Sequence, residues 1–199
     1  MEQENKNLNS HQENFFKEII KFALLAVIIV LPIRFFIAQP FIVSGASMDP
    51  TFADKQYLIV DQISYRFDGP KRGDVIIFRY PLNTKKFFIK RIVGLPSETI
   101  EIKDGQVIIK NKENENKFTI KEPYIDDKKS RNNQAPITLK NDEYFVMGDN
   151  RTESSDSRIW GPLKRSLVVG KPFIRLFPIN KISLFPGSKI PEEIKLNNS

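Results

Sequence analysis

The chain has 199 residues, of which 40% are hydrophobic and 28% are charged, a size and composition that suit one domain with a core of its own. It contains no cysteine and a single histidine, His11. Disulfide frameworks, thiol catalysis and the usual zinc clusters of nitrogen and sulfur ligands are therefore excluded. Magnesium bound by carboxylates is the remaining alternative, but no pattern indicates it, and we expect neither a metal nor a cofactor.

The formal net charge of +7 indicates an anionic partner. The two obvious partners are nucleic acid and the anionic headgroups of membrane lipids. The lysines are scattered along the chain and no nucleic-acid-binding motif is present, so we expect no nucleic acid partner. Attraction to membrane lipids is the simpler interpretation beside an apolar segment, and a merely solvated basic surface is the alternative.

An apolar segment at residues 22–38 reads FALLAVIIVLPIRFFIA, which is about the shortest length that spans a bilayer as a helix. Pro32 is tolerated in such helices, and Arg34 lies near the distal end, where its side chain can reach the headgroups. The alternatives are a buried core helix and a cleavable signal peptide with its apolar region at 22–33. Bulky residues follow where a cleavage site needs small ones, so we expect one retained transmembrane helix.

The orientation of this segment follows from the charges around it. Three lysines precede it, whereas Arg34 and Lys55 lie near its far side. The positive-inside rule then makes residues 1–21 a cytoplasmic tail. We expect a single-pass protein of the cell membrane with residues 39–199 as an extracytoplasmic domain.

Beyond residue 39, short segments rich in β-branched and aromatic residues are typical of strands. Asp104 and Gly105 separate two such segments, residues 99–103 and 106–109, and predict a hairpin with a type I′ turn. No long amphipathic helix pattern follows the apolar segment, so the expected class is mostly antiparallel β. The other expected strands are residues 57–60, 75–78, 87–89, 144–147 and 166–170.

Polar stretches interrupt and flank these strands. Residues 96–140 form a small excursion between the two best core stretches, with polar loops at 110–117 and 126–134. The first fourteen residues and residues 189–199 are also polar, and we expect both ends to be flexible or frayed.

Ser47 lies in the segment SGASMDPT, residues 44–51, directly after the apolar segment. Pro50 fixes its own φ and biases Asp49 toward an extended conformation, while Gly45 permits a positive φ. The serine is therefore on a stiff turn. No histidine or cysteine is available after the apolar segment, so a nucleophilic Ser47 needs another base, and lysine is the main candidate. A turn without a chemical role is the alternative.

Lys90 is a candidate for that base because it lies among apolar residues on a predicted strand, in FFIKRIVGLP at residues 87–96. Strand alternation places Phe88, Lys90 and Ile92 on one face. Burial disfavours the ammonium form and lowers the pKa of lysine, as a general base requires. The alternative is an edge lysine whose amine reaches solvent.

A third segment, GDNRTESSDSRIWGP at residues 148–162, is dense in hydrogen-bonding side chains and contains the only tryptophan, Trp160. A tryptophan is normally packed, so it pins this polar loop to the domain. Hydroxyl groups in the loop can orient a lysine amine by hydrogen bonding. A carboxylate–arginine ion pair can hold the loop in place. A polar surface loop is the alternative.

In this order behind an apolar segment, the three segments resemble the motifs of type I signal peptidases, the membrane-anchored serine–lysine proteases. The segment RGDVIIFRYP at residues 72–81 also resembles part of the lysine region of this family. The resemblance extends from about residue 22 to residue 177. It implies a coiled, partly open β-barrel-like catalytic domain. It also implies an endopeptidase that removes N-terminal signal peptides from exported preproteins after small residues.

The resemblance implies that Ser47 is the nucleophile, that neutral Lys90 is the general base, and that the backbone N–H of Ser47 is an oxyanion donor. Gly45 stands where some members of the family have a serine that supplies a second donor. The other implied residues are the supporting side chains Ser154, Asp156 and Arg158, the structural loop residues Asp149, Asn150 and Arg151, and the pocket walls Phe41, Val43, Met48, Phe88 and Ile89.

Two alternatives to this function stay open at the level of sequence. A non-catalytic, membrane-anchored β domain for binding or scaffolding needs neither the Ser47 hydroxyl nor a free lysine amine. Another serine–lysine protease, such as a self-cleaving regulator, usually lacks an anchor.

Overall fold

The chain forms two compact units, Met1–Gln39 and Pro40–Ser199, in the computed structural model. The predicted N-terminal tail and most of the two predicted polar loops lie outside the described residues. The parts of the chain that the structure describes are residues 16–30, 38–111, 117–125, 133–188 and 192–195.

In the first unit, residues 16–30 form a helix whose large apolar side chains are exposed. This helix includes the first part of the predicted membrane segment, 22–38, and residues 31–37 lie outside the described residues. Among the described residues, no helix combines the length and the apolar character needed to cross a membrane. The anchor and its orientation therefore remain predictions.

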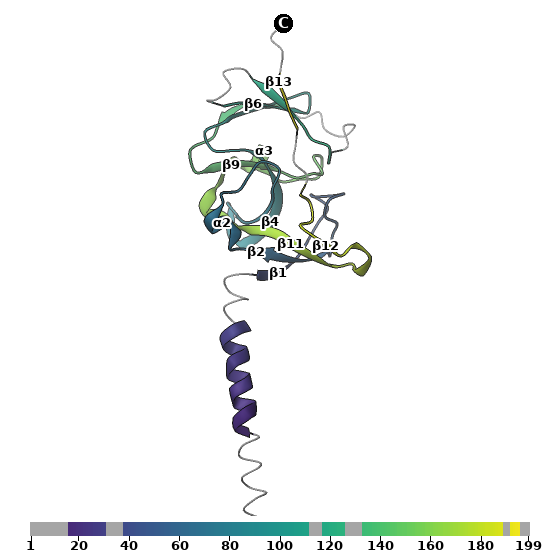
Figure 1. The fold of residues 1–199 in the computed structure, drawn as a ribbon. Coiled ribbons are helices and arrows are strands. Elements are labelled where there is room, and N and C mark those ends of the chain that lie inside the picture. The colour runs from purple at the N-terminus through teal and green to yellow at the C-terminus, as the bar shows by residue number, and fades with distance from the viewer. Residues whose placement is uncertain (1–15, 31–37, 112–116, 126–132, 189–191, 196–199) are drawn as a thin grey trace, which may run out of the picture. The chain divides into compact units, whose positions relative to one another are not determined.

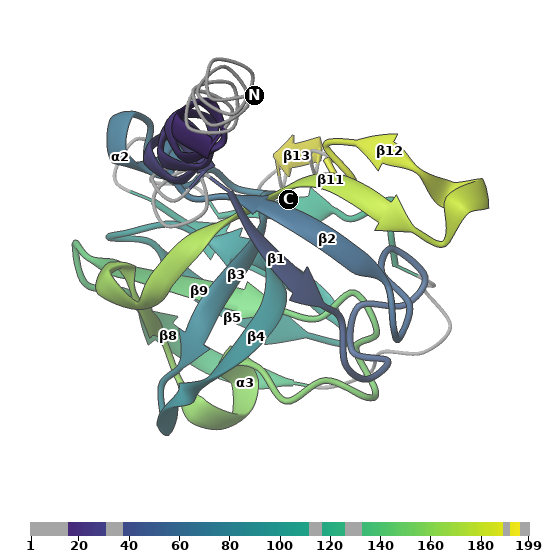
Figure 2. The ribbon, with the colours of Figure 1, turned by 90° about the horizontal axis from the view of Figure 1, so that it is seen from below.

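The second unit is built on an eight-stranded, curled sheet with the order β1-β2-β11-β3-β4-β9-β10, in which β12 also pairs with β11 (Figures 1 and 2). The pairs β2–β11, β3–β4 and β4–β9 are antiparallel, which confirms the predicted class, mostly antiparallel β. The strands of this sheet are β1 (Ala38–Ile42), β2 (Tyr57–Asp61), β3 (Val75–Tyr80), β4 (Asn83–Gly94), β9 (Glu143–Met147), β10 (Leu163–Lys164), β11 (Val168–Phe177) and β12 (Ser183–Leu184).

A second, five-stranded sheet has the order β13-β7-β6-β5-β8 (Figure 1). Its β5–β6 hairpin turns at Asp104 and Gly105, with φ values of 51° and 81°, and these two positive angles confirm the predicted turn. The strands of this sheet are β5 (Thr99–Lys103), β6 (Gln106–Lys110), β7 (Phe118–Lys121), β8 (Gln134–Thr138) and β13 (Glu192–Lys195).

Two boundaries differ from the sequence-based expectation. Glu192–Lys195, within the end expected to be frayed, forms β13 and pairs with β7. Strand pairing there satisfies the backbone of an edge that would otherwise be free, whatever the polarity of the added strand. The strand expected at 166–170 begins only at Val168, because Arg165–Leu167 form a 3₁₀ turn. The other short helices are α2 (Ser64–Phe67), α3 (Ser157–Trp160) and a 3₁₀ turn at Ile179–Lys181.

Strand β4 is buried on both faces in its second half because it contributes to two apolar cores. Val93 packs with side chains of the second sheet, whereas Ile92 packs in a cluster that includes Phe78 and Tyr144. Side chains that alternate along this stretch therefore enter the protein interior on either side. The stretch includes Lys90, so the fold itself carries this lysine away from water.

Candidate active site

Lys90 and Ser47, which lie 43 residues apart in the chain, meet in the folded domain. The Lys90 Nζ atom lies 2.7 Å from the Ser47 Oγ atom and 2.9 Å from the carbonyl oxygen of Ile89. The Phe88 ring lies beside the amine, with its centroid 5.3 Å from Nζ. Lys90 is only 3% exposed, so its amine is shielded from water except at the side of the serine.

The environment of Lys90 favours the neutral amine. Burial lowers the pKa of Lys90 from 10.5 to about 8, against the charges of Asp156 and Asp149, which raise it. Near pH 8, neutral and protonated lysine are therefore both well populated. A neutral amine beside a hydroxyl is able to accept its proton.

The Ser47 turn is held from both ends. Gly45, with a φ of 89°, adopts the left-handed conformation that its lack of a Cβ permits, and its N–H donates to Asp54 Oδ1 at 2.8 Å. The Asn150 backbone N–H donates to the Ser47 carbonyl oxygen at 3.1 Å. The Asn150 side-chain amide also donates to the Ala46 carbonyl oxygen at 3.2 Å. The polar loop thus fixes the backbone on which the serine stands.

Asp156 and Arg158 tie that polar loop together. Arg158 donates from Nε and Nη2 to the two carboxylate oxygens of Asp156, both at 2.8 Å, and Asp156 also accepts from the Gly148 backbone N–H at 3.0 Å. Burial raises the pKa of Asp156, but the hydrogen bonds and the charge of Arg158 outweigh it, so the pKa lies below the ordinary value. The carboxylate stays ionised and continues to accept these bonds.

Ser154 lies in the same loop and is 8% exposed. No hydrogen bond joins its Oγ atom to the Lys90 amine, so the expected bond is not formed in this conformation, and the hydroxyl instead helps to lower the pKa of Asp156. The loop packs tightly here, because a Cβ atom on Gly148 would lie 2.3 Å from both Ser154 Oγ and the Ser47 carbonyl oxygen. Only glycine at position 148 allows the approach of these two serines.

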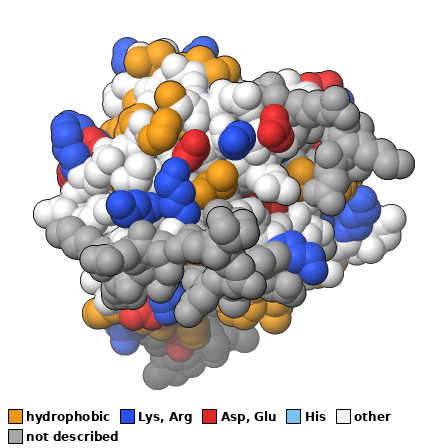
Figure 3. Space-filling model, turned by 90° about the horizontal axis from the view of Figure 1, so that it is seen from above, with side chains coloured by type: hydrophobic (Ala, Val, Ile, Leu, Met, Phe, Trp, Pro, Cys, Tyr) orange, Lys and Arg blue, Asp and Glu red, His pale blue; other side chains and the backbone are white. Residues whose placement is uncertain are grey.

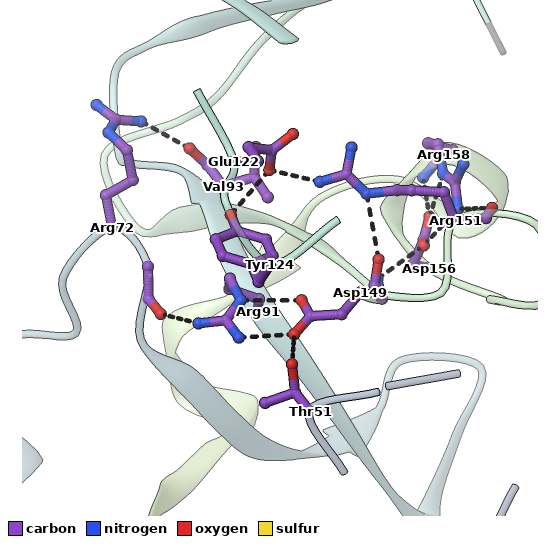
Figure 4. Close-up of polar contacts among 12 residues, drawn as sticks. Thr51, Arg72, Arg91, Val93, Glu122, Tyr124, Asp149, Arg151, Asp156 and Arg158 are labelled. Carbon is purple, nitrogen blue, oxygen red and sulfur yellow. Dashed lines mark hydrogen bonds and ion pairs between the residues drawn. The ribbon is translucent and has the colours of Figure 1, made fainter. Parts of the chain in front are cut away.

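Beside this site, Arg91 and Asp149 form an ion pair to which the sequence analysis assigned no role (Figure 4). Arg91 donates from Nε and Nη2 to the carboxylate of Asp149 at 2.9 Å and 2.6 Å, and the two side chains are 0% and 1% exposed. Thr51, four residues after Ser47, donates its hydroxyl to the same carboxylate at 2.5 Å. The sequence signal that could have revealed this pair is Arg91 itself, a second cation beside Lys90 in the otherwise apolar stretch of residues 87–93.

An apolar cleft of about 510 Å³ opens at the Ser47–Lys90 pair. Four of the five expected wall residues line it: Phe41, Val43, Phe88 and Ile89. The lining residues that the sequence analysis did not single out as cleft walls include Leu58, Ile77, Lys86, Phe87, Glu153 and Ser155.

Met48 is the expected wall residue that does not line the cleft. It is 1% exposed and packs in the core with Val43, Phe52 and Leu58. Because the turn presents Ser47 to the cleft, the side chain of the next residue, Met48, points into the core, where its packing stabilises the turn.

The antiparallel β domain and the pairing of Ser47 with a buried lysine are the features expected of a serine–lysine peptidase. The family described as signal peptidase, peptidase S26, matches residues 16–177. The chain therefore belongs to the signal peptidase family.

Two relatives found by their sequences agree with this assignment. The chain is 32% identical over 197 residues to a probable signal peptidase I-2 of Synechocystis sp., covering 96% of this chain and 87% of that protein. It is 36% identical over 173 residues to a signal peptidase I of Leptolyngbya laminosa, covering 83% and 81% of the two chains. Among solved structures, a signal peptidase I of Enterococcus faecalis V583 is 31% identical, with a TM-score of 0.43, and covers 52% of this chain and 97% of that one.

Proposed function

We propose that this protein is a membrane-anchored endopeptidase that removes N-terminal signal peptides from exported preproteins. Membership of the signal peptidase family supports the reaction and the substrate class. The observation that carries the proposal is the distance of 2.7 Å between Lys90 Nζ and Ser47 Oγ at an apolar cleft. This pair supplies a nucleophile and a base without histidine or cysteine.

In the proposed mechanism, neutral Lys90 accepts the hydroxyl proton of Ser47 while Oγ attacks the scissile carbonyl carbon. The resulting oxyanion is stabilised by the backbone N–H of Ser47. Protonated Lys90 then gives its proton to the leaving amine, and the C–N bond breaks to leave an acyl ester on Ser47. Lys90, neutral again, takes a proton from water as the water attacks the ester carbonyl. It then returns this proton to Ser47 Oγ as the ester C–O bond breaks, which restores the free serine and neutral lysine.

The proposed specificity for small residues before the cut follows from the cleft walls. The rings of Phe41 and Phe87 meet edge to face, with centroids 5.2 Å apart, and Val43, Phe88 and Ile89 complete the apolar lining. Bulky aromatic walls leave shallow subsites, so short apolar side chains fit and charged ones lose their hydration without a partner.

The proposed arrangement in the membrane comprises a cytoplasmic tail at 1–21, an anchor at 22–38 and an extracytoplasmic catalytic domain at 39–199, with an excursion at 96–140. The exposed apolar side chains of residues 16–30 support it, because such a surface calls for apolar surroundings. The lysines and arginines on the described part of one face of the molecule are scattered among acidic side chains (Figure 3). This scatter favours general attraction to lipid headgroups over a nucleic acid site.

Cleavage of a purified preprotein by the full-length protein in detergent tests the proposal. Ser47→Ala and Lys90→Ala should each reduce cleavage by at least about 10²-fold, since each removes one half of the proposed dyad. Lys103→Ala is the matched control, because Lys103 is an exposed strand lysine of the second sheet and does not line the cleft. Thermal unfolding checks that every variant is folded. Cleavage that persists in either dyad variant would overturn the assignment, and a wild type without cleavage would favour the non-catalytic alternative.

A further inference from the structure

Two side chains that follow β7 of the second sheet lie against the catalytic loop. Glu122 and Tyr124 come directly after this strand, outside the eight-stranded sheet that carries Lys90. Both are buried: the Glu122 side chain is 7% exposed and Tyr124 is 4% exposed. A carboxylate that is removed from water in this way needs a cationic partner.

Glu122 finds that partner in Arg151 of the catalytic loop (Figure 4). The Arg151 Nη2 donates to Glu122 Oε1, and the Tyr124 hydroxyl donates to the same oxygen at 2.8 Å. Arg151 is itself bonded to the loop on two sides: its Nε donates to the Gly148 carbonyl oxygen at 3.2 Å, and its own carbonyl accepts from Arg158 at 2.8 Å. Glu122 therefore fixes the arginine that spans the loop.

Tyr124 makes the second contact with the site. Its ring packs on the guanidinium of Arg91, which lies 3.9 Å from the ring centroid, and Arg91 holds the carboxylate of Asp149. Burial raises the pKa of Tyr124, and the charge of Glu122 raises it further, so the phenol keeps its proton. It can therefore always donate to Glu122 while its ring covers Arg91.

These two contacts converge on residues 148–151, which hold the backbone of the Ser47 turn through Asn150 and include Asp149, whose charge acts on the Lys90 amine. The charged groups around Lys90 are Asp156 with Arg158 and Asp149 with Arg91 on the interior side, and Lys86 and Glu153 along the cleft. Burial is the main reason for the low pKa of Lys90. A looser loop would admit water, and a less well paired Asp149 would add negative charge. Both changes raise the pKa of Lys90.

We infer that Glu122 and Tyr124 are positioning residues, which act from the second sheet through Arg151 and Arg91 to keep the Lys90 amine enclosed and aimed at Ser47. This inference rests on the proposed function for its effect on catalysis. It gives the small second sheet a role in the reaction, although neither residue touches the substrate or the dyad. The Tyr124 hydroxyl and Arg151 donate to the same oxygen, Glu122 Oε1, so Glu122 and Tyr124 hold the catalytic loop together.

The variants Glu122→Gln and Tyr124→Phe test this inference in preprotein cleavage from pH 5 to pH 10. Glu122→Gln should lower kcat by about tenfold or more while KM changes little, because the cleft is untouched. Its activity should also reach half of the maximum at a pH higher by about half a unit or more. Tyr124→Phe keeps the ring on Arg91 and should show a smaller shift in the same direction.

Glu101→Gln is the matched control, because Glu101 also forms an ion pair in the second sheet, with Lys117 at 2.6 Å, but at the surface. It should leave kcat and the pH profile unchanged. A Glu122→Gln variant that is folded and has the wild-type pH profile and kcat would overturn the inference, even if its unfolding temperature falls, and the same result for Tyr124→Phe would remove that residue from it.

A titration of Lys90 by NMR of lysine-labelled protein separates this inference from the proposed function, because it needs no substrate. The Lys90 signal, assigned from its loss in Lys90→Met, should titrate at higher pH in Glu122→Gln than in the wild type. An unchanged Lys90 pKa would overturn the inference even for an active enzyme. If the wild type does not cleave preproteins, the proposed function fails while the titration still tests the enclosure of Lys90.

Discussion

Lys90 and Arg91 are consecutive in strand β4 and both are buried, yet only Arg91 is paired with a carboxylate. Arg91 is held by Asp149 through two hydrogen bonds, whereas Lys90 forms no ion pair within the described part of the chain and lies 2.7 Å from Ser47 Oγ. A paired arginine keeps its charge, and a lysine that is buried without a carboxylate partner loses its proton readily. Two consecutive positions of the strand thus carry a permanent cation and a potential base, and their side chains point to opposite faces of the sheet.

The first prediction concerns the pH dependence of the wild-type reaction. Burial lowers the pKa of Lys90 to about 8, and the proposed mechanism needs the neutral amine. The value of kcat/KM should therefore rise as pH increases, reach half of its maximum near that pH and level off above it. Initial rates of preprotein cleavage from pH 5 to pH 10 measure this profile. A flat profile would exclude a lysine base.

The second prediction concerns the cost of burying Lys90. Its pKa falls from 10.5 to about 8 on folding, so between these values the unfolded chain binds more protons and the free energy of unfolding rises with pH. Below pH 8 the whole penalty is present, about 3 kcal/mol for a shift of this size. Lys90→Met should remove it and stabilise the protein at pH 7 by up to about 3 kcal/mol, with a smaller gain at pH 10. Urea unfolding at both pH values tests this, and equal stability of the two proteins at pH 7 would contradict it.

The third prediction concerns the buried ion pair. Asp149→Asn removes the charge that compensates Arg91, and both side chains are almost fully inaccessible. The free energy of unfolding should fall by about 3–5 kcal/mol, as is typical when one partner of a buried pair is lost. For comparison, Glu101→Gln breaks a more exposed pair and should cost no more than about 1 kcal/mol. Denaturant unfolding of the two variants measures the difference, and similar losses would refute the structural role given to Asp149.

The fourth prediction concerns Gly148. A Cβ atom there would lie 2.3 Å from the Ser47 carbonyl oxygen and from Ser154 Oγ, so Gly148→Ala must displace the turn that carries Ser47, the proposed nucleophile. A displacement of about 1 Å typically costs about 10²-fold in rate. Gly69→Ala is the control, because nothing lies within 4 Å of a Cβ atom at that position. If Gly148→Ala retains the wild-type kcat, the contact between the loop and the Ser47 turn does not matter for catalysis.

Local patterns predicted much of the fold. The alternating residues of β5 and β6 and the Asp104–Gly105 turn are short-range signals, and the structure has the hairpin that they indicate. No local pattern predicted the β13 strand, because Glu192–Lys195 is polar. This segment forms a strand because it pairs with the edge of β7. An edge of this kind depends on the whole sheet, so a local pattern does not reveal it.

The identities of the main site residues were predictable from the sequence, whereas their contacts with one another were not. The family motifs pointed to Ser47 and Lys90, and the structure brings the two together, but no spacing along the chain shows that residues 43 positions apart will meet. Arg91 and Asp149 were not recognised as a pair for the same reason, since they lie 58 positions apart. The family resemblance implied that Met48 is a pocket wall, whereas the direction of the turn sends its side chain into the core.

The N-terminal sequence of the cleavage product shows whether this protein removes signal peptides through Ser47. A purified preprotein is incubated with the full-length wild type and, in parallel, with Ser47→Ala. We expect a single new N-terminus directly after a small residue at the end of the signal peptide, produced by the wild type alone. A new N-terminus produced equally by Ser47→Ala, or a cut elsewhere in the preprotein, would contradict this expectation.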